Sequence, residues 1–297
     1  MVLKGRLGLK TARIPHKDRH GLMWLEYGKL LVEEGNVMFI TAGNDQLRPG
    51  AYEIPCQLVS NIILGPGTTV SHDALRILVN QDTGLMAVGE KGVRVYAVSL
   101  PLGPDRSKMA RQHISHWYPE ERRIEVAREM YRIRLGGSLP EYNRDINTLR
   151  GIEGHRMKAL YEHFAQRHSV EWKGRRFDRS NPEHDDAINT SINHSATACY
   201  AAAFIAVAST GAIPQLGFIH ESSARAFALD IADLFRHSFT LPVAFSATAS
   251  TKDGSKENLE RTTRRLAAKT LQKDQVISKM IDHIKSLLKS DDSSRDT

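Results

Sequence analysis

The sequence predicts an α+β protein in which a small β-rich N-terminal domain is followed by a larger all-helical C-terminal domain. Up to about residue 100, short apolar or β-branched runs alternate with glycines, a pattern typical of strands and tight turns. After residue 106, apolar residues recur every three or four positions, which is the period of amphipathic helices. The chain has 297 residues, 41% of them hydrophobic, and is therefore long enough to form two such cores.

The first domain is expected over residues 1–100. One helix interrupts its strands, because Ser71 is a suitable N-cap and apolar residues follow it at helical spacing. The segment 101–106, which contains prolines and a glycine, is expected to be the linker. The expected strands cover residues 23–27, 30–32, 37–41, 60–64, 85–88 and 93–98.

The helical domain is expected over residues 107–289. Its longest apolar stretch, residues 196–208, is too short to span a bilayer and predicts a buried helix. Residues 290–297 contain no apolar side chain and are expected to form a disordered tail. The expected helices cover residues 107–117, 120–135, 146–168, 185–208 and 222–239, with two or three more before residue 288.

The charge balance favours a polyanionic partner. The chain carries 41 Lys and Arg against 34 Asp and Glu, a formal net charge of +7, so nucleic acid is the first candidate. The two cysteines, Cys56 and Cys199, form no CxxC pair, which excludes a zinc ribbon or a disulfide framework and indicates a reducing compartment. The basic N-terminus lacks the apolar core of a signal peptide. A cytoplasmic protein without a membrane partner is therefore expected.

One carboxylate lies where a helix should be apolar. A carboxylate that loses its water must be protonated, paired with a base or bound to a metal ion. Two flanking glycines, Gly151 and Gly154, each cost a helix interior about 1 kcal/mol relative to alanine, which indicates close approach by a ligand or a neighbouring helix. A buried ion pair and a metal site both remain open. The carboxylate is Glu153, and its apolar seam consists of Leu149, Met157, Tyr161 and Phe164.

A second acidic cluster belongs to the helix expected over residues 222–239. Asp230 and Asp233 are three residues apart, so a helix places them on one face, where two like charges repel. His220 comes just before this helix, which allows its ring to point toward the same pocket. Carboxylates and an imidazole from separate helices suit Mg²⁺ or Mn²⁺ better than zinc. Neutralisation of the aspartates by Arg225 or Arg236 is the alternative.

Three further patterns carry less information. The basic and aromatic residues 172–177 suit phosphate binding and base stacking, or a solvated loop with one buried tryptophan. Basic residues at helical spacing over residues 261–273 indicate a solvated helix face. The pairs His16/His20 and His113/His116 lack supporting cysteines or carboxylates and are interpreted as surface histidines.

The order of motifs resembles the spacer-acquisition integrase of CRISPR systems, in its subtype I-E form. The motifs are LRGIEG, WKGRRFD, GFIH and ALDIADLFR, preceded by WLEYGKL, GPGTTVSHDALR and VGEKGVRVYA, and the resemblance spans residues 14–288. It implies a helical catalytic domain and a β-rich domain for dimerisation and bracketing of DNA ends. It also implies a homodimer that joins a small ferredoxin-like CRISPR-associated partner protein, binds a short DNA duplex and inserts it at the leader end of the array.

The resemblance assigns roles to individual residues. The family's metal ligands fall on Glu153, His220 and Asp233, with Asp230 as a further catalytic carboxylate and Mg²⁺ or Mn²⁺ as the metal. Tyr27 matches the aromatic residue that brackets the duplex end, although it could simply end a strand. Thr69 departs from the pattern, because relatives carry an arginine there. The DNA-contacting positions fall on Arg76, Arg94, Arg150, Trp172 and Tyr200.

The expected reaction is direct transesterification, in which a donor 3′-hydroxyl attacks a phosphodiester of the CRISPR array beside a bound divalent metal. With water as the nucleophile, the same site would act as a nuclease. Two alternatives remain: a metal-dependent nuclease acting on branched DNA intermediates in repair, and a DNA-binding scaffold whose acidic residues are inert ion pairs.

Overall fold

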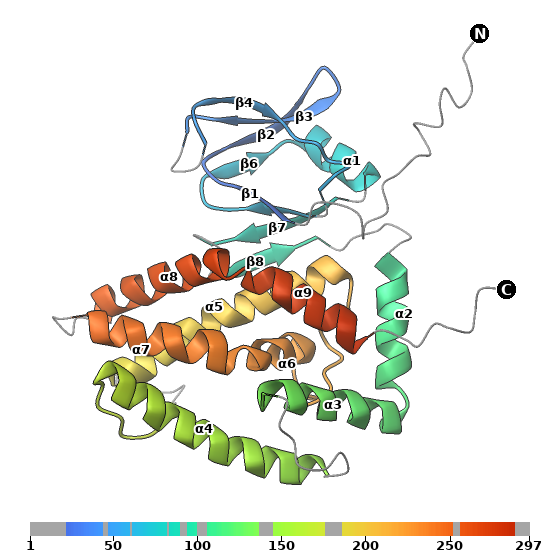
Figure 1. Cartoon of the computed structure of the whole chain (residues 1–297). Coiled ribbons are helices and arrows are strands. Elements are labelled where there is room, and N and C mark those ends of the chain that lie inside the picture. Colours follow the sequence, from blue (N-terminus) through green and yellow to red (C-terminus); the bar gives the residue numbers. More distant parts are fainter. Residues whose placement is uncertain are drawn as a thin grey trace. The chain divides into compact units, whose positions relative to one another are not determined.

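The computed structural model describes residues 22–43, 47–59, 61–81, 83–89, 94–99, 106–136, 145–175, 186–251 and 256–288. These residues fall into two compact units, of which the first extends to Lys108 and the second begins at Met109 and also takes in Arg94. The first unit is rich in strands and the second is helical (Figure 1), which confirms the predicted fold class. Most of the expected linker, the pair His16/His20 and the expected tail lie outside the described residues.

The strands of the first unit form two four-stranded sheets. One sheet has the order β1-β5-β7-β8 and the other β4-β3-β2-β6. Parallel pairing joins β1 to β5, β5 to β7 and β2 to β6, whereas the remaining neighbours are antiparallel. The strands are β1 (Leu22–Leu25), β2 (Gly28–Glu33), β3 (Asn36–Thr41), β4 (Gly50–Glu53), β5 (Asn61–Leu64), β6 (Thr68–Val70), β7 (Gly84–Val88) and β8 (Val95–Val98).

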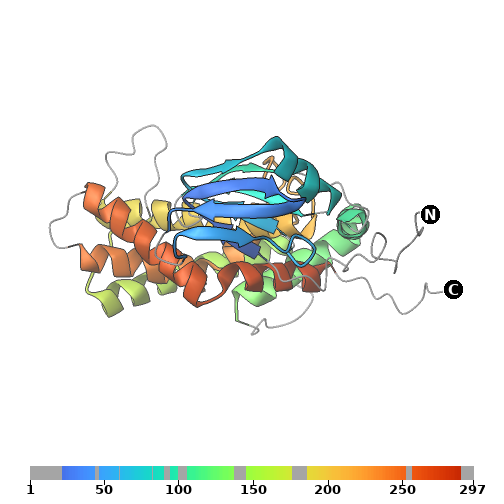
Figure 2. The same ribbon diagram turned by 90° about the horizontal axis from the view of Figure 1, so that it is seen from above.

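A two-residue turn fixes the register of the β2–β3 hairpin. Glu34 and Gly35 both have positive φ, 49° and 83°, as the right-handed strand twist requires of such a turn. The turn places Leu30 opposite Phe39, and both side chains are buried in the core of the unit. Figure 2 shows β2, β3 and β4 side by side.

Helix α1 (His72–Asn80) supplies the remaining side of this core. Ser71 caps it as predicted, since its hydroxyl accepts a hydrogen bond from the Ala74 amide at 3.2 Å. Ala74 and Leu78 are fully buried against the strand side chains. The short strands β4 and β6 were not predicted, because their sequences, GAYE and TTV, show no alternation of apolar and polar residues over a useful length.

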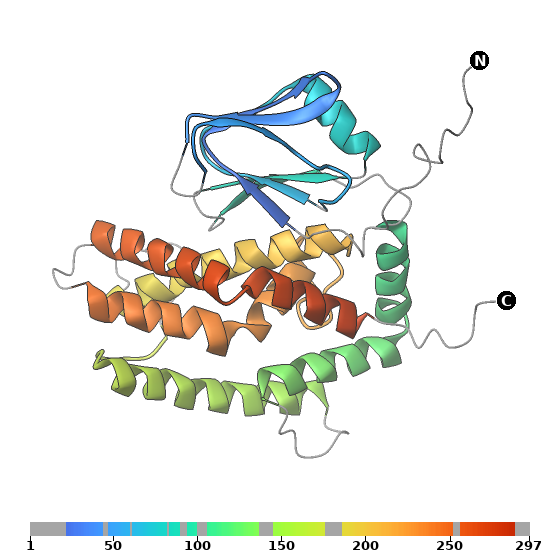
Figure 3. The same ribbon diagram turned by 45° about the horizontal axis from the view of Figure 1, so that its top comes forward.

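The second unit is built around one central helix, α5 (Ala187–Thr210), which packs against α6, α7, α8 and α9. Figure 3 shows α7, α8 and α9 running alongside it. Many of its buried residues are alanines, which allow close helix approach. The other helices are α2 (Arg106–Trp117), α3 (Glu120–Arg134), α4 (Ile146–His168), α6 (Ala226–Leu234), α7 (Leu241–Ser250), α8 (Lys256–Lys273) and α9 (Val276–Leu287).

The helix predicted over residues 222–239 is divided in the structure. Helix α6 begins only at Ala226, and Arg225 occupies its cap position without a side-chain cap bond. A π-helical turn, η5 (Arg236–Thr240), follows α6 and leads into α7. Such turns occur often at functional sites. Within the part of the chain that is described, no helix is long and apolar enough to cross a membrane.

Candidate active site

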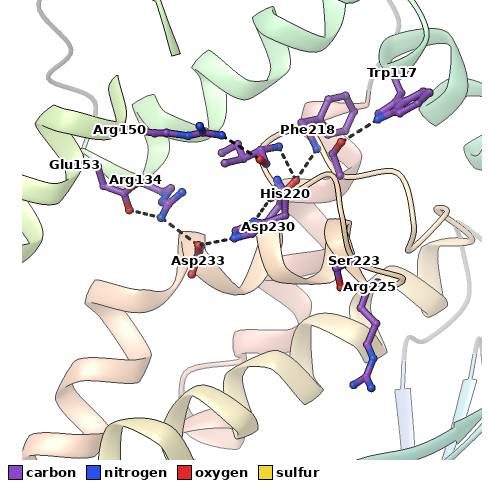
Figure 4. A network of polar contacts seen from close by, with 12 residues as sticks. Trp117, Arg134, Arg150, Glu153, Phe218, His220, Ser223, Arg225, Asp230 and Asp233 are labelled. Carbon is purple, nitrogen blue, oxygen red and sulfur yellow. Dashed lines mark hydrogen bonds and ion pairs between the residues drawn. The ribbon is translucent and has the colours of Figure 1, made fainter. Parts of the chain in front are cut away.

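Asp230 organises the segment that precedes α6. Its side chain is 0% exposed, and its two carboxylate oxygens accept hydrogen bonds from three successive backbone amides (Figure 4). The amides of Phe218 and Ile219 donate to Oδ2 at 2.6 and 3.1 Å, and the amide of His220 donates to Oδ1 at 3.0 Å. Because a buried carboxylate is stable only when its oxygens are satisfied, Asp230 and this segment depend on each other.

The same carboxylate orients the ring of His220. The Nδ1 atom of His220 lies 2.6 Å from Oδ1 of Asp230, and this hydrogen bond is the main reason that the pKa of His220 is raised. With Nδ1–H donated to Asp230, Nε2 is the ring atom left for another partner. It lies 3.9 Å from Oδ2 of Asp233. Asp230 therefore acts as the supporting carboxylate, behind a histidine that faces Asp233.

Helix α2 holds the segment from its other side. The indole of Trp117 donates to the carbonyl of Gly217 at 2.9 Å. His113 contacts the Leu216 carbonyl through Nε2 at 2.7 Å and accepts the Ile213 amide at Nδ1, at 3.1 Å. A side chain on Gly217 would collide with the His220 carbonyl, so the path of the segment requires glycine there.

The prediction that His113 is a surface histidine is wrong. Its side chain is fully buried, and burial lowers its pKa to about 4, so it is neutral at physiological pH. Its partner His116 is only half-buried and bonds through Nδ1 to the carbonyl of Gln112 in the same helix. The sequence spacing suggested a pair, but only His113 reaches the segment before α6.

An arginine stands between the two remaining carboxylates. The Nη2 atom of Arg134 forms ion pairs with Oε1 of Glu153 and, at 3.2 Å, with Oδ2 of Asp233 (Figure 4). The side chain of Arg134 is only 6% exposed. Burial raises the pKa of Glu153, and Arg134 opposes this effect. Arg134 is therefore the basic partner of Glu153 in the buried ion pair that the sequence analysis gave as one alternative.

Of the two arginines proposed for this role, Arg225 makes another contact, whereas Arg236 acts on the acidic pair through its charge. The guanidinium of Arg225 lies over the ring of Tyr200, 5.6 Å from its centroid. Arg236 follows Asp233 at the start of the π-helical turn; burial disfavours its charge, but attraction to Asp233 and Glu153 raises its pKa. Arg236 thus adds positive potential near the acidic pair.

The donor set fits a divalent metal ion, although the carboxylates hold a guanidinium in this arrangement. As placed, the described His, Cys, Asp and Glu residues form no group of three or more that could hold a metal, because Arg134 separates Glu153 from Asp233. Two carboxylates and an imidazole supported by a third carboxylate nevertheless match the ligands of Mg²⁺ and Mn²⁺. The buried guanidinium shows that this point of the fold requires positive charge.

A cavity of about 460 Å³ opens beside these residues. Its lining includes the carboxylates of Glu153 and Asp233 and an apolar wall around Met157 and Leu160. The basic residues in the lining are Arg134, Arg156, Arg236, His163 and His237. An acidic pair bordered by arginines suits a phosphodiester whose charge is balanced at the site.

Among the second-unit residues assigned to DNA contact, Arg150 adjoins this site, and its Nη2 lies 3.5 Å from the carbonyl of Ile219. Trp172 is half-buried and stacks on Tyr161, with ring centroids 4.7 Å apart, so one of its faces is covered. Tyr200 contacts Arg225, as described above, and Arg94 pairs with Glu260 at 3.5 Å in the second unit.

The other assigned residues belong to the first unit. Tyr27 is 51% exposed and has a φ of 56°, an unusual backbone conformation for an aromatic residue. Arg76 pairs with Asp73 in α1 at 3.4 Å and remains largely exposed. Thr69 is exposed in β6.

Sequence reasoning missed Arg134, although a signal was present. The buried face of α3 carries Ala127, Met130 and Tyr131, and Arg134 continues it at the i+7 position. An arginine in an apolar seam is the counterpart of Glu153 in the seam of α4. Two opposite charges that each occupy an apolar position, on neighbouring helices, indicate a buried ion pair.

Comparison with known proteins gives the class of the molecule. A family model described as CRISPR associated protein Cas1 matches residues 135–285. The CRISPR-associated endonuclease Cas1 of Escherichia coli K12 is 37% identical over 232 residues, which is 78% of this chain and 74% of that relative. A relative of the same description from Geobacter sulfurreducens is 36% identical over 237 residues, 80% of this chain and 75% of the relative. The class is that of CRISPR-associated endonucleases.

Solved structures agree with this result. The structure of a TtCas1–DNA complex matches with a TM-score of 0.81 and 28% identity, covering 93% of this chain and 98% of the other. A casposase bound to its integration product has the same fold, with a TM-score of 0.62, 17% identity and coverage of 91% and 96%. The chain belongs to the Cas1 family, as its motifs predicted.

Proposed function

We propose that this protein is a metal-dependent DNA integrase and endonuclease of CRISPR adaptation, which inserts short duplexes into the CRISPR array. The observation that carries this proposal is the convergence of Glu153, Asp233 and Nε2 of His220 near one buried cation, in the helical unit of a Cas1 fold. The net charge of +7 and the DNA bound by the similar TtCas1 support DNA as the substrate.

A Mg²⁺ or Mn²⁺ ion held by Glu153, Asp233 and His220 would stabilise the charge on the attacked phosphodiester and its departing oxygen. In strand transfer, the donor 3′ oxygen forms a bond to phosphorus while the bond from phosphorus to the target 3′ oxygen breaks. The donor proton passes to solvent, and the departing 3′ oxygen takes up a proton from solvent. Asp230 keeps Nε2 of His220 directed at Asp233 throughout.

Direct attack by DNA agrees with the chemistry of the nearest thiol. Cys199 is buried beside α6, and burial raises its pKa to about 12, so it is not a thiolate at neutral pH. In the proposed transfer the donor hydroxyl itself attacks, and this thiol takes no part. Water in place of that hydroxyl gives strand cleavage at the same site.

The DNA contacts are proposed from the Cas1 resemblance and from exposure. Arg150 is exposed next to the acidic residues and can bind a phosphate there. Tyr27 is available to bracket a duplex end, and Arg76, Arg94 and Tyr200 supply further contacts. Trp172 contributes through the parts of its ring that Tyr161 does not cover. Thr69 cannot make the charged phosphate contact of an arginine.

The proposed working form is a homodimer bound to a small ferredoxin-like CRISPR-associated partner. The first unit would provide the dimer contacts and the brackets for the DNA ends. Action on a chromosomal array places this assembly in the cytoplasm.

The proposal is tested by strand transfer of a labelled short duplex with 3′-hydroxyl ends into a supercoiled array plasmid, with the small partner and either Mn²⁺ or EDTA. Glu153→Gln and Asp233→Asn are expected to abolish joining while the protein remains folded. Glu162→Gln is the matched control, because Glu162 lies on α4 as well but is exposed. It should join DNA like the wild type.

The products separate the candidate functions. Covalently joined donor and target identify an integrase, whereas nicked or shortened strands alone identify the nuclease of branched DNA. Salt-sensitive DNA binding without any metal-dependent product would indicate a scaffold. Substantial joining by both acidic-site variants would refute the assignment of Glu153 and Asp233.

A further inference from the structure

Arg134 is built into the protein interior and is not a mobile surface side chain. It is the last residue of α3 and continues the buried face formed by Ala127, Met130 and Tyr131. Its guanidinium lies over the ring of Tyr131, 5.4 Å from the centroid. Its position is therefore set by packing as well as by charge.

The oxygens that Arg134 binds are the ones a metal ion would need. Its Nη2 atom contacts Oε1 of Glu153 and Oδ2 of Asp233, and Oδ2 of Asp233 also lies 3.9 Å from Nε2 of His220. A divalent ion and a guanidinium repel each other, and both would require the same oxygens in a site of low polarity. The two cations therefore compete.

We propose that Arg134 is the resting counter-ion of the active site: it yields Glu153 and Asp233 to the entering divalent metal and then binds a phosphate of the DNA in the adjacent cavity. This inference rests on the proposed function.

The cavity gives the displaced guanidinium a new partner. Arg134 already forms part of the lining, together with Arg156 and Arg236. Without DNA, a released Arg134 would face two other arginines and would lose its carboxylates. A phosphate in the cavity replaces those carboxylates with an anion that matches the guanidinium geometry.

Metal binding and DNA binding are consequently linked through one side chain. DNA stabilises the state in which Arg134 has left the carboxylates, and that is the state that binds the metal. By reciprocity, the metal strengthens DNA binding by the same factor. The site therefore loads its metal most readily when DNA is present.

The first test is a Mn²⁺ titration of the full-length protein without DNA, with free Mn²⁺ measured by electron paramagnetic resonance. Arg134→Met is expected to bind Mn²⁺ roughly tenfold more tightly than the wild type, because the competing cation is absent. Arg134→Lys keeps a charge that cannot bridge both carboxylates and should give an intermediate affinity. Arg132→Met is the matched control, since Arg132 lies on the same helix, is exposed and pairs with Glu129.

Thermal unfolding supplies a reading that does not depend on catalysis. In EDTA, Arg134→Met should unfold at a lower temperature than the wild type, because two carboxylates lose their cation. Mn²⁺ should raise its unfolding temperature by more than it raises that of the wild type. If Arg134→Met does not fold in EDTA, the rise in unfolding temperature with Mn²⁺ is compared between Arg134→Lys and the wild type instead.

The second test repeats the titration with a duplex that has dideoxy 3′ ends and cannot react. DNA should increase Mn²⁺ affinity more in the wild type than in Arg134→Met. An equal increase would overturn the phosphate-binding role. Unchanged or weaker Mn²⁺ binding by Arg134→Met and Arg134→Lys without DNA would overturn the counter-ion role. Failure of the proposed function would give a different result: Glu153→Gln would bind Mn²⁺ as well as the wild type does, or neither protein would bind it.

Discussion

Replacement of Asp230 by asparagine tests whether this carboxylate assembles the site. The wild-type side chain uses both oxygens, with two donors on Oδ2 and two on Oδ1. An asparagine keeps one acceptor oxygen and turns an NH₂ group toward the other two donors. The substitution keeps the size and shape of the side chain, so its effect measures the lost hydrogen bonds together with the lost negative charge beside His220.

The expected loss of stability follows from this count. Each buried donor left without an acceptor costs about 1–3 kcal/mol, so the two lost bonds together cost about 2–6 kcal/mol. This is a large part of the roughly 5–15 kcal/mol that stabilises a domain. Asp233→Asn is the matched control one helical turn away. It is expected to cost less than about 2 kcal/mol, because Asp233 is partly exposed and Arg134 retains Glu153.

Two measurements check the reasoning. Urea unfolding gives the free-energy difference between each variant and the wild type. Hydrogen exchange followed by mass spectrometry reports on the amides of residues 218–220, which should lose protection in Asp230→Asn and keep it in Asp233→Asn. An Asp230→Asn protein with wild-type stability and protected amides would refute the assembling role.

Three further outcomes are expected. Burial lowers the pKa of His113 from 6.5 to about 4, so the unfolded chain takes up a proton at this residue before the folded chain does as the pH falls. Between pH 7 and pH 5 the wild type should therefore lose about 2 kcal/mol more stability than His113→Gln. Urea unfolding at both pH values checks this difference. Tyr27→Gly should be more stable than Tyr27→Ala by about 1 kcal/mol in thermal unfolding, because only glycine adopts the positive φ of this position without strain. Equal stability of the two variants would contradict a strained backbone at Tyr27. Both variants should lose selection of duplex length in strand transfer. Gly154→Ala should raise the free energy of unfolding by up to about 1 kcal/mol, because its Cβ would meet no atom of the described residues within 4 Å. It should also lower the yield of joined DNA, because its methyl group would keep DNA from the backbone there; unchanged joining would contradict close approach of DNA to this glycine.

Elements with a long apolar pattern could be predicted from the sequence, whereas contacts between residues far apart in the chain could not. The period of apolar residues located α4 at its observed bounds, and Ser71 gave the start of α1. Within α4, close approach of a neighbouring helix to Gly151 and Gly154 was a wrong expectation, since none of the described residues comes near either Cβ position. The π-helical turn after α6 had no signal that distinguishes it from a continuous helix.

The acidic residues stood out because each is a charge at an apolar position, which sequence periodicity detects. Their partners did not, because α3 and α4 are separate in sequence and only packing brings Arg134 to Glu153. His113 was misjudged for the same reason. Its hydrogen-bond partners lie about a hundred residues further along the chain.

The unequal roles of Asp230 and Asp233 affect how mutant cells should be interpreted. Under the proposed function, a strain with a substituted Asp230 would fail to acquire spacers because proteases remove a poorly folded chain, so its protein level would fall. A strain with a substituted Asp233 would accumulate a folded but inert protein, which still competes for partners and DNA and should act as a dominant inhibitor of a normal copy. The same phenotype at neighbouring aspartates thus has two causes, and only immunoblotting and co-expression separate them.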